Sequence, residues 1–345
     1  MSEFVQKEIN AFPIPIALFM FKRAESTVKI VKRISLVKPS KLYLIADEGR
    51  NAEEKKAVAD CRRAVLEAID WPCEVIRYFA EENRGVYANI GLGAKWVFSQ
   101  EPMAIFLEDD NLPEESFFEY CRQLLEKYQD NDDILWICGT NYLAKYENER
   151  KESYMFTKHL LPCGWASWAN KFCKYYDGEL ECATPENLKS LRSKYESKAL
   201  YEQQKYCIRK ELYRKETGKK FISWDYQMAF SVRFHNKYGI SPCNNQIRNI
   251  GVDGLSEHGG NNMNNVMTNR FCGMQSHSLN FPLIHPEKVA IDPMYEKKIQ
   301  NIILNPRNMR LKRKIKCILL RLLGLNDAMP FSEAKQEIKK KLKSK

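Results

Sequence analysis

The sequence lacks any long hydrophobic run. No apolar segment of the 345-residue chain approaches the roughly 20 residues that a membrane-spanning helix needs. Eleven cysteines are present, yet no two form a CxxC pair and no secretory leader precedes them. An odd cysteine count without a leader favours reduced thiols over a disulfide framework. We therefore expect a cytoplasmic protein without a transmembrane helix.

Net positive charge is scarce outside the C-terminal segment. Residues 306–345 contain thirteen Lys or Arg and three Asp or Glu, so they carry +10 of the formal net charge of +11. The rest of the chain is nearly neutral and lacks the basic stripe by which proteins bind nucleic acids. We therefore expect no nucleic-acid partner, and a basic nucleic-acid-binding protein is the weakest alternative function.

Apolar runs and helical stretches alternate in the first third of the chain. The pattern predicts strands at 14–21, 41–46, 73–79 and 104–107, and helices at 26–37 (capped by Ser26), 53–70 and 87–100. This alternation predicts an α/β fold with a mixed, mainly parallel, Rossmann-like sheet flanked by helices.

The second half follows a different pattern. We expect a strand at 134–138, an aromatic segment at 159–172, helices at 185–217 and 224–238, a strand at 239–250 and a loop rich in Gly and Asn at 251–265. No internal repeat and no low-complexity linker interrupts the chain before the tail. One unit with a modified second half is therefore expected, rather than two independent domains.

Three consecutive carboxylates, Glu108, Asp109 and Asp110, follow the fourth predicted strand. Adjacent carboxylates repel one another unless they face water, cap a helix or share a divalent cation. Mn²⁺ and Mg²⁺ prefer oxygen ligands and commonly combine one or two carboxylates with nucleotide phosphates. Alternation along the chain predicts that Asp109 points away from its two neighbours. In the alternative, Asp110 or Asn111 caps a helix that begins at Pro113.

Other charged residues follow the neighbouring strands. Arg23 follows the first strand and Asp47 follows the second. In a parallel sheet, both residues would lie at the same edge as the acidic cluster. A guanidinium suits phosphate, and a carboxylate suits the imide N–H of a pyrimidine. Arg84 lies beside Gly85 at a predicted helix start, where a phosphate can bind. Each charge alone is equally explained by a solvated loop, but together they predict a nucleoside diphosphate pocket.

Three segments resemble one enzyme family. They are residues 18–51, FLEDDNLPEESFFEYC at 106–121 and FISWDYQM at 221–228. They resemble glycosyltransferases of the GT-A fold, notably the inverting N-acetylglucosaminyltransferase that initiates complex N-glycans and bacterial polysaccharide glycosyltransferases. The resemblance covers residues 14–260. It implies a GT-A fold, a UDP-linked sugar donor, Mn²⁺ or Mg²⁺ as cofactor, and a saccharide acceptor in bacterial surface polysaccharide synthesis.

The resemblance also implies roles for individual residues. Arg23 matches an arginine that contacts the donor diphosphate or uridine, and Asp47 matches the residue that recognises uracil. Glu108 and Asp109 match positions that contact the nucleotide sugar. Asp110 matches the metal-binding aspartate.

An inverting transfer needs a base on the side of the sugar opposite the leaving diphosphate, hence a carboxylate outside the acidic cluster. Asp225, between Trp224 and Tyr226, matches the region that supplies this base in the inverting relatives. Its alternative role is an N-terminal helix cap. Glu257 is the reserve candidate.

Further donor-site candidates come from the second half. Trp165 and Trp168 are candidates to line the sugar subsite, although aromatic residues at this spacing also pack protein cores. Arg248 and His258 are candidates to assist where a loop closes over the donor, with His258 as a second metal ligand. A single histidine is equally explained as a structural residue. The loop at 251–265 departs from the family because it is shorter and richer in asparagine.

A sugar-nucleotide nucleotidyltransferase is the main alternative function. Such an enzyme would use similar carboxylates, but it needs a glycine-rich, basic phosphate loop near the N-terminus. The segment Lys22, Arg23, Ala24, Glu25 contains no glycine. The sequence therefore favours glycosyl transfer.

The segment 310–325 combines basic and apolar residues at helical spacing. A basic amphipathic helix can lie on an anionic leaflet, where each basic group contributes about 1 kcal/mol. We expect this peripheral contact on the inner face of the cytoplasmic membrane, which suits a lipid-linked saccharide acceptor. In the alternative, the helix packs on the domain. The expected division is a catalytic part at 1–265 (donor half 14–112, acceptor half 113–265), an extension at 266–305 and the basic tail at 306–345.

Overall fold

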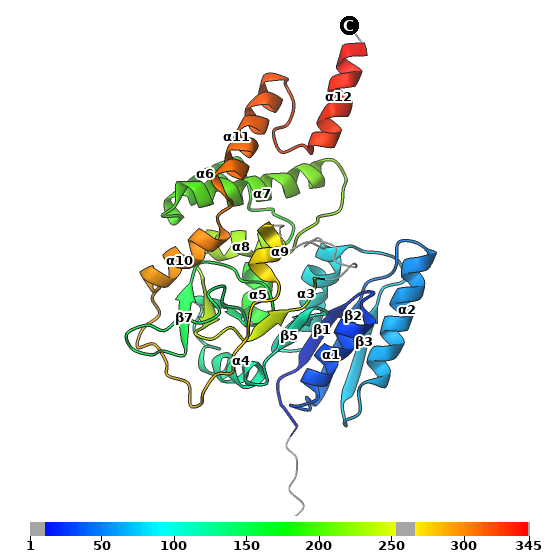
Figure 1. Ribbon diagram of the computed structural model, residues 1–345, viewed down its shortest axis with the longest axis vertical. Helices are drawn as coiled ribbons and strands as arrows, with labels where there is room; N and C mark the ends of the chain where they lie inside the picture. Colours follow the sequence, from blue (N-terminus) through cyan, green and yellow to red (C-terminus); the bar gives the residue numbers. More distant parts are fainter. Residues whose placement is uncertain (1–10, 253–265, 344–345) are drawn as a thin grey trace, which may run out of the picture.

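The computed structural model describes residues 11–252 and 266–343. An eight-stranded sheet forms its centre, and a small two-stranded sheet lies beside it (Figure 1). The strands are β1 (Ile16–Met20), β2 (Lys41–Ala46), β3 (Glu74–Phe79), β4 (Met103–Glu108), β5 (Asn111–Pro113), β6 (Ile134–Cys138), β7 (Tyr154–Thr157), β8 (Trp165–Trp168), β9 (Tyr238–Pro242) and β10 (Ile247–Asn249). The helices are α1 (Ala24–Ile34), α2 (Ala52–Glu67), the π-helical η1 (Tyr87–Leu92), α3 (Gly93–Phe98), α4 (Ser116–Lys127), α5 (Ala169–Tyr175), α6 (Pro185–Ser190), the 3₁₀ turn η2 (Leu191–Lys194), α7 (Lys198–Glu216), α8 (Asp225–Phe234), α9 (Val266–Phe271), α10 (Pro293–Ile303), α11 (Arg307–Leu322) and α12 (Phe331–Lys343).

The predicted α/β fold with a mainly parallel sheet is confirmed. The strand order is β3-β2-β1-β4-β8-β6-β9-β7. β1 pairs in parallel with β2 and β4, and β2 pairs in parallel with β3. Only β8 and β7 run against their neighbours. Because β1, β2 and β4 point the same way, their carboxyl ends meet at one edge of the sheet.

Side chains of the central strands alternate between two buried layers, as a period of two requires. In β1, Ala17 and Phe19 pack on the side of η1, α3, α5 and α8, whereas Ile16, Leu18 and Met20 pack on the side of α1, α2 and α4. All five are almost completely buried. Helices therefore cover both faces, and only the sheet edge is left for a site.

Several predicted boundaries need correction. Ser26 does not cap α1: the helix begins at Ala24, and the Ser26 hydroxyl donates within the helix to the Arg23 carbonyl oxygen (3.3 Å). The predicted strand at 239–250 is two strands, β9 and β10, because β10 leaves the main sheet to pair with β5. The sequence pattern also missed β7, whose side chains are buried on both faces and show no alternation.

The helix-cap alternative for the acidic cluster is wrong. Asn111 begins strand β5, and α4 starts only at Ser116 with Glu115 at its N-cap position. Pairing with β10 keeps β5 extended at Asn111–Pro113, where the alternative expected a helix to begin. Asp109 and Asp110 therefore lie in the turn between β4 and β5.

The C-terminal helices pack on α7, at the top of Figure 1. The buried carboxylate of Asp327 accepts hydrogen bonds from Arg209 of α7 (2.9 Å) and from Arg321 of α11 (2.6 Å). Tyr213 of α7 also donates to Glu333 of α12 (2.9 Å). No helix among residues 11–252 and 266–343 has the length and apolar character to cross a membrane. All eleven cysteines are free.

Candidate active site

A cleft of about 1150 Å³ opens at the carboxyl ends of β1, β2 and β4. It brings together residues from the two halves of the chain and from α11. Its charged and aromatic lining comprises Phe19, Phe21, Arg23, Asp47, Arg50, Glu108, Asp109, Asp110, Tyr206, Lys210, Trp224, Asp225, Tyr226, Lys312, Arg313, Lys316 and Phe331. The strand ends that were predicted to meet therefore do line one cavity.

Arg23 holds two members of the acidic cluster. Its Nη1 lies 3.0 Å from Asp110 Oδ2 and 3.4 Å from Asp109 Oδ1. The other Asp109 oxygen accepts the backbone N–H of Phe21 (3.2 Å). The prediction that Asp109 points away from Asp110 is therefore wrong, because the chain turns directly after Glu108 and strand alternation ends there.

The carboxylate of Asp110 lies in a tight backbone setting. Its Oδ1 accepts a hydrogen bond from the Asn111 side-chain amide (2.6 Å), and its backbone carbonyl accepts from the Ile250 N–H (2.8 Å). Gly251 lies beside it so closely that a Cβ atom at this position would clash with Oδ2. Glycine at 251 therefore makes room for the carboxylate at the cleft wall.

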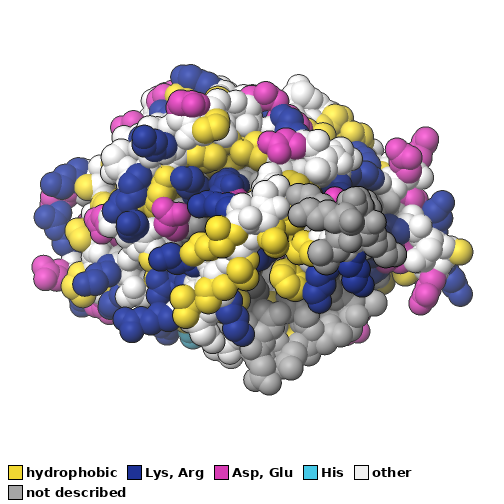
Figure 2. Space-filling view, turned by 90° about the horizontal axis from the view of Figure 1, so that it is seen from above, with side chains coloured by type: hydrophobic (Ala, Val, Ile, Leu, Met, Phe, Trp, Pro, Cys, Tyr) yellow, Lys and Arg dark blue, Asp and Glu magenta, His cyan; other side chains and the backbone are white. Residues whose placement is uncertain are grey.

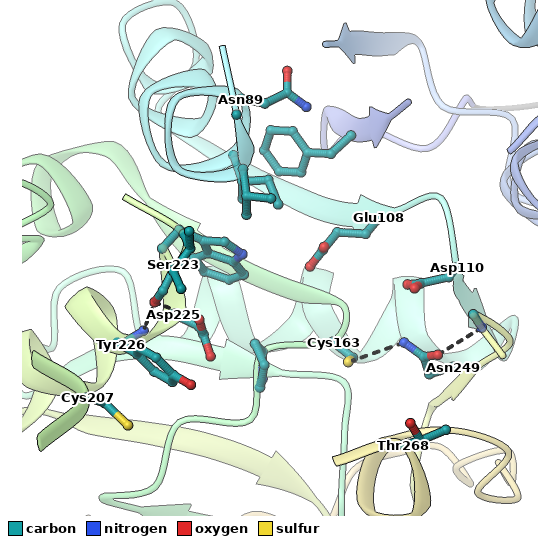
Figure 3. A pocket seen from close by; sticks show the side chains of 18 of the residues that line it. Asn89, Glu108, Asp110, Cys163, Cys207, Ser223, Asp225, Tyr226, Asn249 and Thr268 are labelled. Carbon is teal, nitrogen blue, oxygen red and sulfur yellow. Dashed lines mark hydrogen bonds between the residues drawn. The ribbon is translucent and has the colours of Figure 1, made fainter. Parts of the chain in front are cut away.

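Glu108 points into the cleft between Asp225 on one side and Asp110 on the other (Figure 3). Burial raises its pKa well above the ordinary value, and the charges of Asp110, Asp109 and Asp225 raise it further. The carboxylates of Glu108, Asp109 and Asp110 outnumber Arg23, which pairs with two of them, so this part of the cleft favours a cation.

Asp47 anchors the loop that follows β3. Its two carboxylate oxygens accept the backbone N–H groups of Glu48 (2.9 Å), Arg84 (2.7 Å) and Gly85 (2.9 Å) and the side-chain amide of Asn83 (3.1 Å). Four donors occupy the usual acceptor positions of a carboxylate. Asp47 thus lines the cleft while it positions Asn83 and Gly85 in the cleft wall.

Asp225 is the first residue of α8 and faces the cleft from the side opposite β4 (Figure 3). The hydroxyl of Ser223 accepts the backbone N–H of Tyr226 (2.9 Å), so Ser223 takes a capping role at this helix end. The same hydroxyl lies 3.0 Å from Asp225 Oδ1, to which it can donate. The preceding residue, Trp224, is buried, and its ring stacks on Trp165 (5.7 Å between centroids). The carboxylate is thus oriented at a helix N-terminus with a partly apolar backing.

A smaller cavity of about 130 Å³ adjoins the cleft at Asp225. Asp225, Tyr226 and Cys207 line both cavities. Tyr142 and Arg270 are among the residues that line only the smaller one. Asp225 therefore lies where two cavities meet, so that a group in either can reach it.

Three predicted donor-site residues do not line the cleft. Trp165 is 1% exposed in the central strand β8, and its ring stacks on Phe106 (3.9 Å between centroids) and Trp136 (4.2 Å). The Arg84 guanidinium lies over the Tyr78 ring, 4.4 Å from its centroid, and donates to Asn89 (3.1 Å). Arg248 is exposed on β10.

Trp168 is also a core residue, since its ring N–H donates to the Leu125 carbonyl (2.9 Å). The predictions that Trp165 and Arg84 contact the donor need correction on this geometry, because packing within the fold takes up both side chains. Arg248 has no place in the cleft lining. His258 and Glu257 lie outside the described residues.

Sequence reasoning missed the wall of the cleft formed by α7 and α11. Gln203, Tyr206, Cys207 and Lys210 line it from α7, at positions i, i+3, i+4 and i+7. The helical spacing of these four residues is present in the sequence, but the many charged residues between them obscure the pattern. Nothing local in the sequence indicates that the basic residues of 306–345 face this stripe.

The donor set of the cleft is compatible with a divalent cation. Among the described residues, no group of three or more His, Cys, Asp or Glu could hold a metal unaided. Mg²⁺ and similar ions, however, are usually held by one or two carboxylates together with substrate phosphates. Asp110 and Glu108 offer such oxygens at the cleft wall.

No protein-family model matches this chain, and no curated protein matches it. Solved structures with a partial likeness include a mannosyltransferase from Pyrobaculum calidifontis in complex with GDP-Man and Mn²⁺ (10% identity, TM-score 0.31, 46% of each chain covered). Mouse xyloside xylosyltransferase 1 (12%, TM-score 0.33, 66% of this chain and 84% of that one) is another. A third is a UDP-glucose pyrophosphorylase complexed with UDP-glucose (10%, TM-score 0.32, 68% and 92%). The chain thus spans less than half of the mannosyltransferase. Because these TM-scores and sequence identities are low, the function must be argued from the chemistry of the cleft and not from the structural likeness.

Proposed function

We propose that this protein is a metal-dependent, inverting glycosyltransferase of the GT-A type that uses a UDP-linked nucleotide-sugar donor. The observation that carries the proposal is the placement of a separate carboxylate, Asp225, across one cleft from the cluster Glu108 to Asp110. A displacement with inversion requires a base and a leaving-group site on opposite sides of the reacting carbon. The resemblance of three segments to GT-A enzymes supports the same assignment.

Each residue has a defined task in this proposal. Arg23 orients Asp109 and Asp110 and offers charge to the donor phosphates. Asp110, with Glu108 beside it, would hold Mn²⁺ or Mg²⁺, which supplies positive charge to the departing diphosphate. Asp47 fixes the loop after β3, which in this proposal forms the floor of the pocket for the nucleobase of the donor. Its role in uracil recognition remains a proposal, and the four donors it already binds favour a positioning role.

Asp225 acts as the base. Its carboxylate accepts the proton of the acceptor hydroxyl while that oxygen forms the new bond to the anomeric carbon and the nucleoside diphosphate departs. Ser223 donates toward Oδ1 of Asp225 and so helps to orient the carboxylate for this step. Trp224 and Tyr226 limit access of water to this step.

The function is tested by a donor screen with purified protein and Mn²⁺. We expect one of the UDP-, GDP- or TDP-sugars to bind and to release nucleoside diphosphate when an acceptor is present. Proton NMR of the product should show inverted anomeric configuration. Incorporation of pyrophosphate into a nucleoside triphosphate would instead identify a nucleotidyltransferase, and binding of no nucleotide sugar would reject both functions.

We also propose a role in polysaccharide synthesis at a membrane surface, through residues 306–345. The apolar residues of α11 that face away from the cleft are exposed (Leu311, Ile315, Ile318, Leu319 and Leu322), and basic residues flank them. Such a helix can insert its apolar face among anionic lipids. Co-sedimentation with vesicles that contain phosphatidylglycerol should be strong and should fall as salt rises. Equal sedimentation with and without vesicles would exclude the contact. The division at residues 265 and 305 remains a prediction.

A further inference from the structure

Helix α11 presents a basic stripe to the cleft. Met309, Lys312, Arg313 and Lys316 line the cavity, and Leu320, one turn further, is 2% exposed. These positions follow the spacing i, i+3, i+4, i+7 and i+11, which defines one side of a helix. Seen from above, Lys and Arg side chains gather around an exposed hydrophobic strip (Figure 2). The helix thus turns basic groups toward the cavity and apolar groups toward solvent.

Contacts with α7 hold this orientation. Leu320 packs in a small buried cluster with Tyr213, Ala328 and Met329. The Lys316 ammonium donates to the Tyr206 hydroxyl (3.1 Å), and the Arg313 guanidinium lies 5.6 Å from the centroid of the Tyr206 ring. The stripe therefore belongs to a fixed wall.

The wall carries cations that form no ion pair with a described carboxylate. Lys210 of α7 joins Lys312, Arg313 and Lys316 in the lining. Within residues 11–252 and 266–343, no ion pair links Lys210, Lys312 or Arg313 to a carboxylate. Partial burial lowers the pKa of Lys316, since the ammonium loses hydration there. Several cations that line one side of a cavity favour a bound anion.

This wall adjoins the proposed base rather than the proposed metal site. Cys207 of α7, which lies one turn before Lys210, lines both cavities together with Asp225, and Figure 3 shows it beside Tyr226. On the other side, Asp225 faces Glu108 of the acidic cluster across the cleft (Figure 3). Asp225 therefore lies between the acidic cluster and the basic wall, and an anion at the wall would belong to the acceptor rather than to the donor.

We propose that the acceptor carries a phosphate or diphosphate group, which Lys210, Lys312, Arg313 and Lys316 bind next to Asp225. This assignment rests on the proposed glycosyl transfer. Several cations on rigid helices suit the multiple oxygens of a phosphate, and Arg313 can bind two of them at once. The group is a recognition element and does not react; it fixes the acceptor so that its hydroxyl reaches the base.

The test compares two double variants of equal charge loss. Lys312→Ala/Arg313→Ala removes two cations that line the cleft. The control, Arg307→Ala/Lys314→Ala, removes two exposed cations of the same helix that do not line it. Calorimetric titration with inorganic pyrophosphate, in the presence of EDTA to exclude metal-dependent binding, should show affinity about tenfold or more weaker in the first variant. The control should bind as the wild type does.

The source of the phosphate is settled by two further probes. Glucose 1-phosphate in solution represents a soluble acceptor, and phosphatidylcholine vesicles with a polyprenyl diphosphate represent a lipid-linked one. Selective loss of either interaction in Lys312→Ala/Arg313→Ala supports the proposal and identifies the source. If both double variants bind all three probes like the wild type, the proposal is wrong. Nucleotide-sugar binding is measured in parallel: its presence with no phosphate effect overturns only the acceptor assignment, whereas its absence in the wild type overturns the proposed function.

Discussion

Asp225→Asn should reduce the turnover number of glycosyl transfer by about 10²–10⁴-fold, the usual contribution of a positioned general base. The asparagine side chain has the same shape and can accept the Ser223 hydroxyl bond, so α8 and the cleft should stay intact. It cannot take the acceptor proton. Nucleotide-sugar binding should therefore change little, because the proposed donor contacts lie at the carboxyl ends of β1, β2 and β4.

The measurement is a pair of assays on the same preparation. Donor affinity is determined by calorimetry with Mn²⁺, and turnover by release of nucleoside diphosphate. Asp130→Asn is the matched control, since Asp130 is exposed and does not line the cleft. Full turnover in Asp225→Asn would move the base elsewhere, and joint loss of donor binding and turnover would indicate a structural role. Ser223→Ala should lower turnover to a smaller extent.

The parts of this site that the sequence predicted are those that depend on strand direction. Arg23, Asp47 and Asp110 each follow a short apolar run, and parallel pairing of those runs is enough to bring the three side chains to one edge. The prediction needs no knowledge of side-chain packing. It holds because the helices between the strands force a parallel arrangement.

Predictions that depended on tertiary packing were wrong or incomplete. Trp165 had the residue type of a sugar platform, but it lies in β8, a central strand covered on both faces, and nothing in its local sequence distinguishes that strand from a loop. Arg84 was placed correctly at a helix start, yet its guanidinium stacks on Tyr78. The tail showed its amphipathic pattern clearly. The side of α11 that faces the protein is determined by its contacts with α7, which lies some hundred residues earlier in the chain.

Asp110→Asn should weaken Mn²⁺-dependent nucleotide binding by more than about 100-fold, since loss of a ligand should exceed the 10–100-fold cost of losing an outer-shell partner. The variant removes one of the two carboxylates that Arg23 binds and leaves the pair with Asp109 in place. The fold of the turn should survive, because the Asp110 backbone carbonyl keeps its bond to the Ile250 N–H. Binding measured without metal should be weak in both forms.

A second substitution separates the charge of Asp110 from its position. Gly251→Ala keeps the carboxylate but places a Cβ atom in steric conflict with Asp110 Oδ2, so the carboxylate must move. If Asp110 holds the cation, displacement should reduce Mn²⁺-dependent binding as the loss of charge does, although to a smaller extent. Titration of Mn²⁺ with UDP, followed by electron paramagnetic resonance, measures both variants against Asp130→Asn. Wild-type Mn²⁺ affinity in Asp110→Asn would assign the metal to another carboxylate of the cleft, and Glu108 would be the first to test, because it faces the same cavity from the end of β4.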